Sequence, residues 1–283
     1  MSYTLGVLGG SGLYEMEGLS QVQEIAIDTP YGSPSDVLVK GTLPNGTTMV
    51  FLPRHGRGHK VPPHQVNYRA NVCALKKAGA THLVSVTAVG SMKEEIVPGH
   101  LVVPDQFIDL TKKRITTFFE DGVAGHVPFA DPTCVLLAKA LGDAAEKAGG
   151  TTVHRGGTHV VMEGPQFSTR AESRLYRTWG VSVIGMTTMP EAKLAREAEL
   201  PFAALALATD YDCWHEGHDD VTVEAVVATM KKNVSAAKKS LLELSSSLPD
   251  PAKSVAHKAA RGAIMTSPEA MTSQVKERLG WLL

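Results

Sequence analysis

The sequence predicts a three-layer α/β protein, with a mixed central sheet flanked by helices. Short apolar segments of strand length alternate with amphipathic segments of helical length along most of the 283 residues. One apolar run, residues 202–208, is unbroken by polar side chains, which is typical of a strand buried on both faces. A strand of that kind needs helices on both sides of its sheet.

The expected strands are short and apolar, and turn residues bound several of them. They cover residues 4–8, 36–42, 48–52, 82–87, 100–103, 158–162, 181–185 and 202–208. Between the second and third lies Pro44-Asn45-Gly46, which indicates a hairpin because Asn-Gly tolerates positive φ.

Five helices are expected, at residues 65–78, 132–148, 169–179, 190–199 and 223–244. The second should be capped by Asp131 and should end at Gly149, and the third should open with a capping box of Thr169 and Glu172. In the fifth, one apolar stripe is expected to face the core. It contains Val223, Val226, Val227, Met230, Val234, Ala237 and Leu241.

The first loop-like change in composition lies at residues 245–251, Ser-Ser-Ser-Leu-Pro-Asp-Pro. We therefore expect one domain, residues 1–248, followed by a helical tail, residues 249–283. The tail should pack on the same domain or on a neighbouring subunit.

Charge, cysteine spacing and apolar runs narrow the expected binding partners and cellular compartment. With 28 basic and 29 acidic residues, nothing favours nucleic acid or an anionic membrane as a partner. The three cysteines, Cys73, Cys134 and Cys213, have neither a metal spacing nor a disulfide framework, which favours a reducing compartment. No secretory signal and no membrane-spanning apolar run is seen, so the protein is expected to be cytoplasmic.

Two carboxylates follow the run at residues 202–208, in Thr209-Asp210-Tyr211-Asp212-Cys213-Trp214. Strand residues two apart point the same way, so Asp210 and Asp212 should leave the sheet side by side. Two acids with no nearby cation are costly to bury unless something is bound there. The alternative is that both acids cap the next helix or lie in solvent.

Two segments are suited to holding an oxyanion. Gly9-Gly10-Ser11-Gly12 follows the first strand but fits no nucleotide fingerprint, so it is either a phosphate turn or a plain tight turn. Residues 54–60, Arg-His-Gly-Arg-Gly-His-Lys, offer guanidinium and imidazole donors on a flexible loop. A metal is disfavoured there because cations crowd the histidines and no carboxylate or thiolate joins them. The alternative is a solvated basic loop.

Several polar segments follow predicted strands. Residues 10, 87–91, 186–187 and 210 all do so, and ligands of α/β sheets collect beyond the carboxyl ends of strands. This shared placement indicates one common site. Residues 163–168, with aromatic Phe167, and residues 186–188 could form its walls, although each alone is more often packing.

Together these segments resemble the trimeric purine nucleoside phosphorylase family, and look closest to its 5′-methylthioadenosine phosphorylase branch. The resemblance spans roughly residues 5–226. It is carried by residues 9–13, 54–57, 66–71, 87–91, 105–109, 163–168, 177–180, 186–188 and 209–214.

The resemblance implies phosphorolysis of S-methyl-5′-thioadenosine to adenine and 5-methylthioribose 1-phosphate, with inorganic phosphate as co-substrate and no cofactor or metal. It implies phosphate ligands at Ser11, Arg54, His55, Thr87, Ala88 and Thr187. It implies substrate contacts at Phe167, Ser168, Met186, Asp210, Asp212 and Val223, and at His126, which should reach a neighbouring subunit's site in a homotrimer. Ser11 stands where the branch often has Thr, and both side chains supply a hydroxyl.

Physical chemistry assigns the two acids different tasks. A desolvated carboxylate pair can keep one member protonated near neutral pH, so we expect Asp210 to protonate purine N7. Asp212 should accept from the 6-amino group, which favours adenine over 6-oxopurines. The alternatives are a phosphorylase of broader or 6-oxopurine specificity, a hydrolytic nucleosidase, and a nucleoside-binding protein without turnover.

Overall fold

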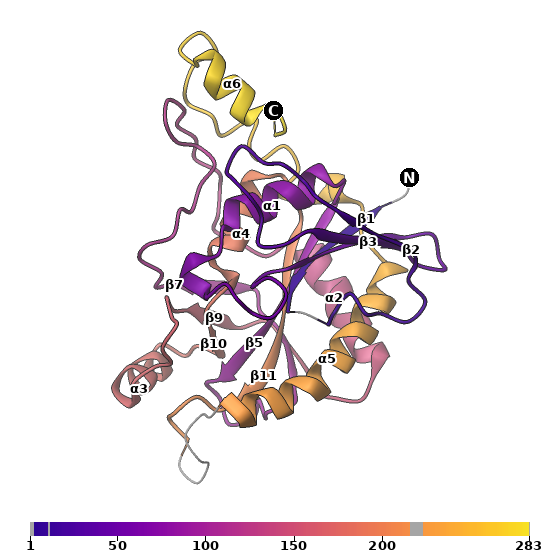
Figure 1. The fold of residues 1–283 in the computed structure, drawn as a ribbon. Helices are drawn as coiled ribbons and strands as arrows, with labels where there is room; N and C mark the ends of the chain where they lie inside the picture. Colours follow the sequence, from indigo (N-terminus) through magenta and orange to yellow (C-terminus); the bar gives the residue numbers. More distant parts are fainter. Residues whose placement is uncertain (1–2, 11, 216–222, 283) are drawn as a thin grey trace.

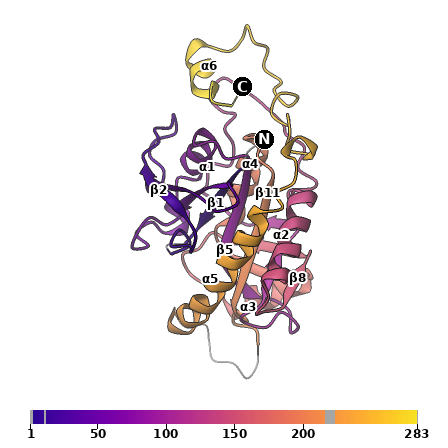
Figure 2. The same ribbon diagram turned by 90° about the vertical axis from the view of Figure 1, so that its right-hand side faces the viewer.

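The computed structural model describes residues 3–10, 12–215 and 223–282, and for residues 223–228 it describes the backbone alone. It has the predicted three layers (Figures 1 and 2). The strands are β1 (Thr4–Gly9), β2 (Ser20–Ile25), β3 (Leu38–Thr42), β4 (Thr48–Pro53), β5 (His82–Ser91), β6 (Leu101–Val103), β7 (Gln106–Asp109), β8 (Val153–Arg155), β9 (Thr158–Val161), β10 (Val183–Gly185) and β11 (Phe202–Asp210). The α-helices are α1 (Tyr68–Lys77), α2 (Val135–Ala148), α3 (Arg170–Thr178), α4 (Thr188–Glu197), α5 (Val223–Ser245) and α6 (Ser273–Leu279), with short 3₁₀ turns at Pro63–Gln65 and Pro251–Lys253.

The sheet is mixed and branches at β5. Its order is β2-β3-β4-β1-β5-β10-β9-β7, and β11 pairs with both β5 and β6, which in turn pairs with β8. Strands β4, β1, β5 and β11 run parallel to one another, whereas β10 is antiparallel to β5. The carboxyl ends of the four parallel strands therefore meet at one edge, as the sequence predicted.

Two apolar clusters cover the two faces of the sheet. One joins the sheet to α1 and α4, and the other joins it to α2 and α5 (Figure 2). Apolar side chains after residue 251, among them Ala260, Val275 and Leu279, belong to the first cluster. The strand β11 is buried from Phe202 to Thr209, which explains its unbroken apolar sequence.

Three predictions that rested on a few neighbouring residues are confirmed. Strands β3 and β4 form the expected hairpin, in which Gly46 has φ +83°. The capping box of α3 is present, with Thr169 and Glu172 each satisfying the other's backbone N–H. The C-cap of α2 is Gly149, with φ +67°.

Three expectations about the elements were wrong. Strand β5 runs on to Ser91, because Gly90 pairs with β10 and β11, so Thr87 lies inside the strand and not after it. Helix α2 begins after Cys134, whose N–H donates to Phe202 O, and Asp131 is not its cap. Strands β2, β7 and β8 were not expected at all.

Candidate active site at the edge of the central sheet

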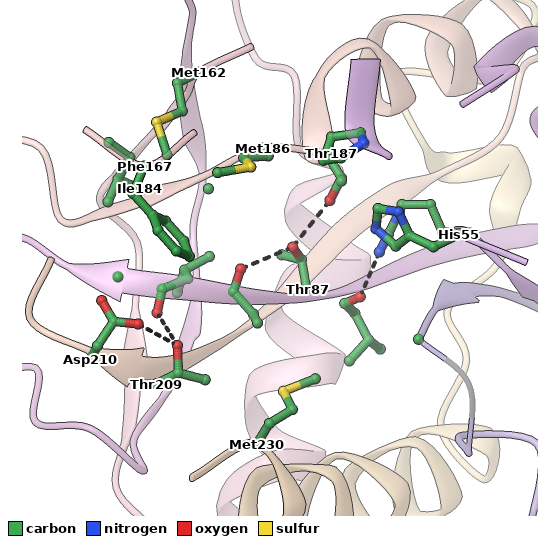
Figure 3. A pocket seen from close by; sticks show the side chains of 18 of the residues that line it. His55, Thr87, Met162, Phe167, Ile184, Met186, Thr187, Thr209, Asp210 and Met230 are labelled. Atoms are coloured by element: carbon green, nitrogen blue, oxygen red, sulfur yellow. Dashed lines mark hydrogen bonds between the residues drawn. The ribbon is translucent and has the colours of Figure 1, made fainter. Parts of the chain in front are cut away.

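A cavity of about 630 Å³ lies where the parallel strands end, a volume usual for a small-molecule site. It brings together most of the residues singled out from the sequence: Gly10, Arg54, His55, Thr87, Ala88, Phe167, Met186, Thr187, Asp210 and Asp212. Figure 3 shows two ends, with His55, Thr87 and Thr187 toward one and Asp210, Phe167 and Ile184 toward the other.

The first end offers hydroxyl groups from two elements. The hydroxyl oxygens of Thr87, in β5, and Thr187, at the start of α4, lie 3.2 Å apart (Figure 3). Thr187 is the N-cap residue of α4, but its side chain makes no capping hydrogen bond. The Thr87 hydroxyl also lies 3.3 Å from Ala88 O, a long contact that it can exchange for a hydrogen bond to an oxyanion, as the Thr187 hydroxyl can exchange its contact with Thr87.

Arg54 supplies a cation to this end, but the protein already occupies most of its donors. It follows β4 directly, and its N–H donates to Gly9 O at 2.8 Å, which joins it to the end of β1. Its guanidinium forms a buried ion pair with Glu191 of α4 and donates to Ser85 Oγ at 2.8 Å. Its Nη1 also donates to Val86 O at 3.1 Å, so part of Nη1 is left for a ligand.

His55 is held by the loop that it begins. Its Nδ1 donates to Val61 O at 2.8 Å, and Val61 N–H donates back to His55 O at 3.0 Å. Burial, with the neighbouring Arg54 guanidinium next in importance, lowers the pKa of His55 to about 4. The ring is therefore neutral at pH 7.

The second end holds the carboxylate pair. Asp210 Oδ2 lies 2.6 Å from Thr209 Oγ1, and Asp210 Oδ1 accepts from Asp212 N–H at 2.8 Å. Burial raises the pKa of Asp210, although these two hydrogen bonds oppose the rise. Burial also raises the pKa of Asp212, to which the Asp210 charge adds. An environment of this kind favours the protonated form of a carboxylic acid.

Asp212 does not reach the cavity by strand alternation, as the sequence reasoning assumed. Strand β11 ends at Asp210, and Asp212 follows in a turn with φ +51°. The Asp212 N–H to Asp210 carboxylate hydrogen bond closes this turn. The two acids do line the same cavity, as expected. What brings Asp212 there is a local turn, which the alternation of side chains along a strand does not predict.

At this second end, Gly90 of β5 forms part of the cavity wall. A Cβ on Gly90 would lie 2.9 Å from Asp210 Oδ1 and 3.1 Å from Ile184 Cγ2. The bare backbone there leaves room for a flat ligand beside the carboxylates.

The guanidinium of Arg114 links two chain segments between the two ends of the cavity. Arg114 is almost fully buried and donates to the carbonyls of Met186 and Met189, both at 2.6 Å, and to Glu163 O at 2.7 Å. It also pairs with the Glu163 carboxylate at 3.0 Å. Arg114 thus joins the segment after β9 to the segment after β10. Nothing in the sequence near Arg114 indicates this role.

Several lining residues were missed from the sequence. Met230 and Val234 of α5 belong to the stripe that was assigned to the core, yet they line the cavity. Farther along the same stripe, Ala237 and Leu241 are fully buried against the sheet, as expected. The stripe is one continuous face, and the cavity opens beneath part of it. His59, which belongs to the segment 54–60 singled out from the sequence, also lines the cavity.

Four expected site residues are not seen in the cavity wall. Ser168 lies beside it, with its hydroxyl 3.5 Å from Met162 Sδ. The backbone N–H of His126 donates to Ala263 O at 2.9 Å, and His126 is not among the residues that line this cavity. Ser11 and the side chain of Val223 lie outside the described residues.

Within the described part of the chain, no group of three or more His, Cys, Asp and Glu side chains is placed to hold a metal ion. In that same part, no helix combines the length and the apolar character needed to cross a membrane.

Comparisons with known proteins show the family of the chain. The model of the phosphorylase superfamily matches residues 4–246. An S-methyl-5′-thioadenosine phosphorylase of Geobacter sulfurreducens is 56% identical over 284 residues, covering 100% of this chain and 99% of that protein.

Solved structures extend the comparison to the whole fold. A methylthioadenosine phosphorylase from an Antarctic soil metagenomic library has a TM-score of 0.94 at 46% identity, covering 100% of this chain and 99% of the other. The methylthioadenosine phosphorylase of Schistosoma mansoni, in complex with adenine, has a TM-score of 0.85 at 36% identity, covering 93% and 99%. The chain therefore belongs to the phosphorylase superfamily, in its S-methyl-5′-thioadenosine phosphorylase branch.

Proposed function

We infer that this protein cleaves S-methyl-5′-thioadenosine with inorganic phosphate, releasing adenine and 5-methylthioribose 1-phosphate. The observation that carries the proposal is the joining, in one cavity, of an oxyanion end and a desolvated carboxylate pair. The relatives reported above, named for this same activity, support it.

The two ends divide the work of the reaction. The bond between ribose C1′ and purine N9 breaks, a phosphate oxygen forms the new bond to C1′, and the base takes up a proton. Phosphate, held by Arg54, His55, Thr87, Ala88 and Thr187, would stabilise the positive charge that develops on the sugar. Ser11, which lies outside the described residues, is proposed as a further phosphate ligand.

The carboxylate pair acts on the base. Asp210, whose pKa is raised by burial, would donate its proton to N7 as the leaving base gains negative charge. Asp212 would accept from the 6-amino group, while Phe167 packs against the base and Met186 lies under the ribose. Ser168 and Val223 are proposed as further substrate contacts.

We further propose a cytoplasmic homotrimer that uses no metal or other cofactor. Residues 1–248 would form the phosphorylase domain and residues 249–283 a tail. In the trimer His126 would reach a neighbouring subunit's site. Its position away from this chain's own cavity agrees with that role.

One assay tests the function. Methylthioadenosine, adenosine and inosine are each incubated with and without phosphate, and the release of free base is followed. We expect adenine from methylthioadenosine only when phosphate is present. Release without phosphate would indicate a hydrolase, and binding without release would indicate a nucleoside-binding protein. Faster cleavage of inosine would indicate a 6-oxopurine phosphorylase.

A further inference from the structure

The orientation of the His55 ring determines which of its nitrogens carries a proton. A carbonyl oxygen can only accept, so the 2.8 Å contact with Val61 O requires the proton on Nδ1. The loop geometry keeps the ring in this position, because Gly56 turns the chain at φ +67° and a Cβ there would lie 3.0 Å from Ser35 O. A neutral His55 therefore has an unprotonated Nε2.

The charges around His55 oppose a second proton. The Arg54 guanidinium is adjacent in sequence, the His59 ring stacks on His55 with centroids 4.3 Å apart, and the Arg114 guanidinium also acts against protonation of His55. With burial, they lower the pKa of His55 to about 4. Among the described residues no protein group donates to Nε2, so this nitrogen offers a lone pair to whatever enters the cavity.

The other side chains at this end, those of Arg54, Thr87 and Thr187, mostly donate hydrogen bonds, and the positive charge of Arg54 is balanced within the protein. The carboxylate of Glu191 pairs with Arg54, so the guanidinium is not an uncompensated cation. The hydroxyls of Thr87 and Thr187 can each donate to an oxyanion. An anion held there meets several donors and one acceptor, and a bare anion oxygen against that acceptor would leave two lone pairs facing each other.

We propose that His55 makes the oxyanion site selective for anions that carry their own proton, with the anion O–H donating to Nε2. Hydrogen phosphate and hydrogen arsenate have such a proton near neutral pH, whereas sulfate has the same tetrahedral shape and none. This rests on the proposed function, in which phosphate is the co-substrate.

The expected discrimination follows from the cost of one unmade hydrogen bond in a buried site. Sulfate should bind roughly 10- to 100-fold more weakly than phosphate at neutral pH. Sulfate can bind well only when His55 itself takes up a proton. Its affinity should therefore approach that of phosphate as the pH is lowered toward the low pKa of His55.

The experiment measures binding of phosphate, arsenate and sulfate to the intact protein by calorimetry, at constant ionic strength and at several pH values. In parallel, sulfate competes with phosphate during methylthioadenosine cleavage. We expect arsenate to bind like phosphate, and sulfate to bind weakly at neutral pH and more tightly as the pH approaches the pKa of His55.

Two variants separate His55 from the rest of the site. In His55→Gln the side-chain amide can turn either its oxygen or its NH₂ toward the anion, so the preference for phosphate over sulfate should largely disappear. Thr87→Val is the matched control. It removes a donor that serves both anions, so both should weaken and their ratio should stay.

Sulfate affinity equal to phosphate affinity in the wild-type protein at neutral pH would overturn the proposal, without need of any variant. A wild-type ratio that His55→Gln leaves unchanged would also overturn it. Failure of the proposed function looks different: the anions would bind in the predicted ratio, yet methylthioadenosine would not be cleaved.

Discussion

The buried pair of Glu191 and Arg54 allows a prediction with a definite magnitude. Both side chains are nearly or fully inaccessible. Glu191 accepts from Arg54 Nε through Oε1, and its Oε2 accepts from Arg54 Nη2 at 3.2 Å and from Ser85 Oγ at 2.6 Å. Glu191→Gln keeps the first acceptor, replaces the second by an NH₂ group, and removes the charge.

The hydrogen bond from Arg54 Nη2 is lost, since it would join two donors, whereas the new NH₂ group can donate to Ser85 Oγ. With the charge removed as well, the Arg54 guanidinium is left without its buried partner, which typically costs ~3–5 kcal/mol. We expect the free energy of unfolding, measured by urea denaturation, to fall by about this amount. Added phosphate should stabilise the variant more than the wild type, because it can replace the missing negative charge.

The exposed pair of Lys139 and Asp143 provides the control. These side chains are 71% and 50% accessible, so Lys139→Gln, which leaves the pairing of Asp143 with Arg155 in place, should leave the urea midpoint nearly unchanged. A loss below ~1 kcal/mol in Glu191→Gln would refute the reasoning, since it would mean that Arg54 does not depend on Glu191 for its charge balance.

Three further predictions concern the base end of the cavity. Asp210→Asn should slow adenine release from methylthioadenosine by roughly 10²–10⁴-fold while calorimetry still detects phosphate binding, and full retention of the rate would remove Asp210 from the mechanism. Because burial raises the pKa of Asp210, and the acid acts only when protonated, kcat should fall as pH rises through that raised pKa; a kcat that increases over this interval contradicts the assignment. Gly90→Ala places a methyl 2.9 Å from Asp210 Oδ1, so KM for the nucleoside should rise roughly tenfold or more with KM for phosphate unchanged, and equal effects on both would place the base elsewhere.

The fold could be predicted where the signal was local or long. The buried run of β11, the hairpin at Gly46 and the capping box at Thr169 each depend on a few neighbouring residues, and all are present. The missed strands lack such signals. Strand β2 is exposed along nearly its whole length and has no apolar alternation, and β8 has three residues. Strand β2 pairs with β3, the next strand along the chain, whereas β7 and β8 depend on partners distant in sequence, β9 and β6.

The site could be predicted only in part, for a similar reason. Thr87 and Asp210 were placed together because their strands share one edge of the sheet. The role of Glu191 could not be inferred, since its partner Arg54 lies 137 positions away. The stripe containing Met230 shows which face of α5 is apolar, but periodicity does not show whether that face meets the sheet or a cavity.

The clamp made by Arg114 has a consequence for how the cavity adapts to its ligands. It fastens the segments around Glu163 and Met186 to each other, so this wall is preorganised and little conformational entropy remains to be lost there on binding. Met230, an unbranched and deformable thioether on α5, lines the cavity outside this clamp. We therefore expect the cavity to adjust to ligands of different shape through side chains such as Met230, while the segments held by Arg114 keep their position.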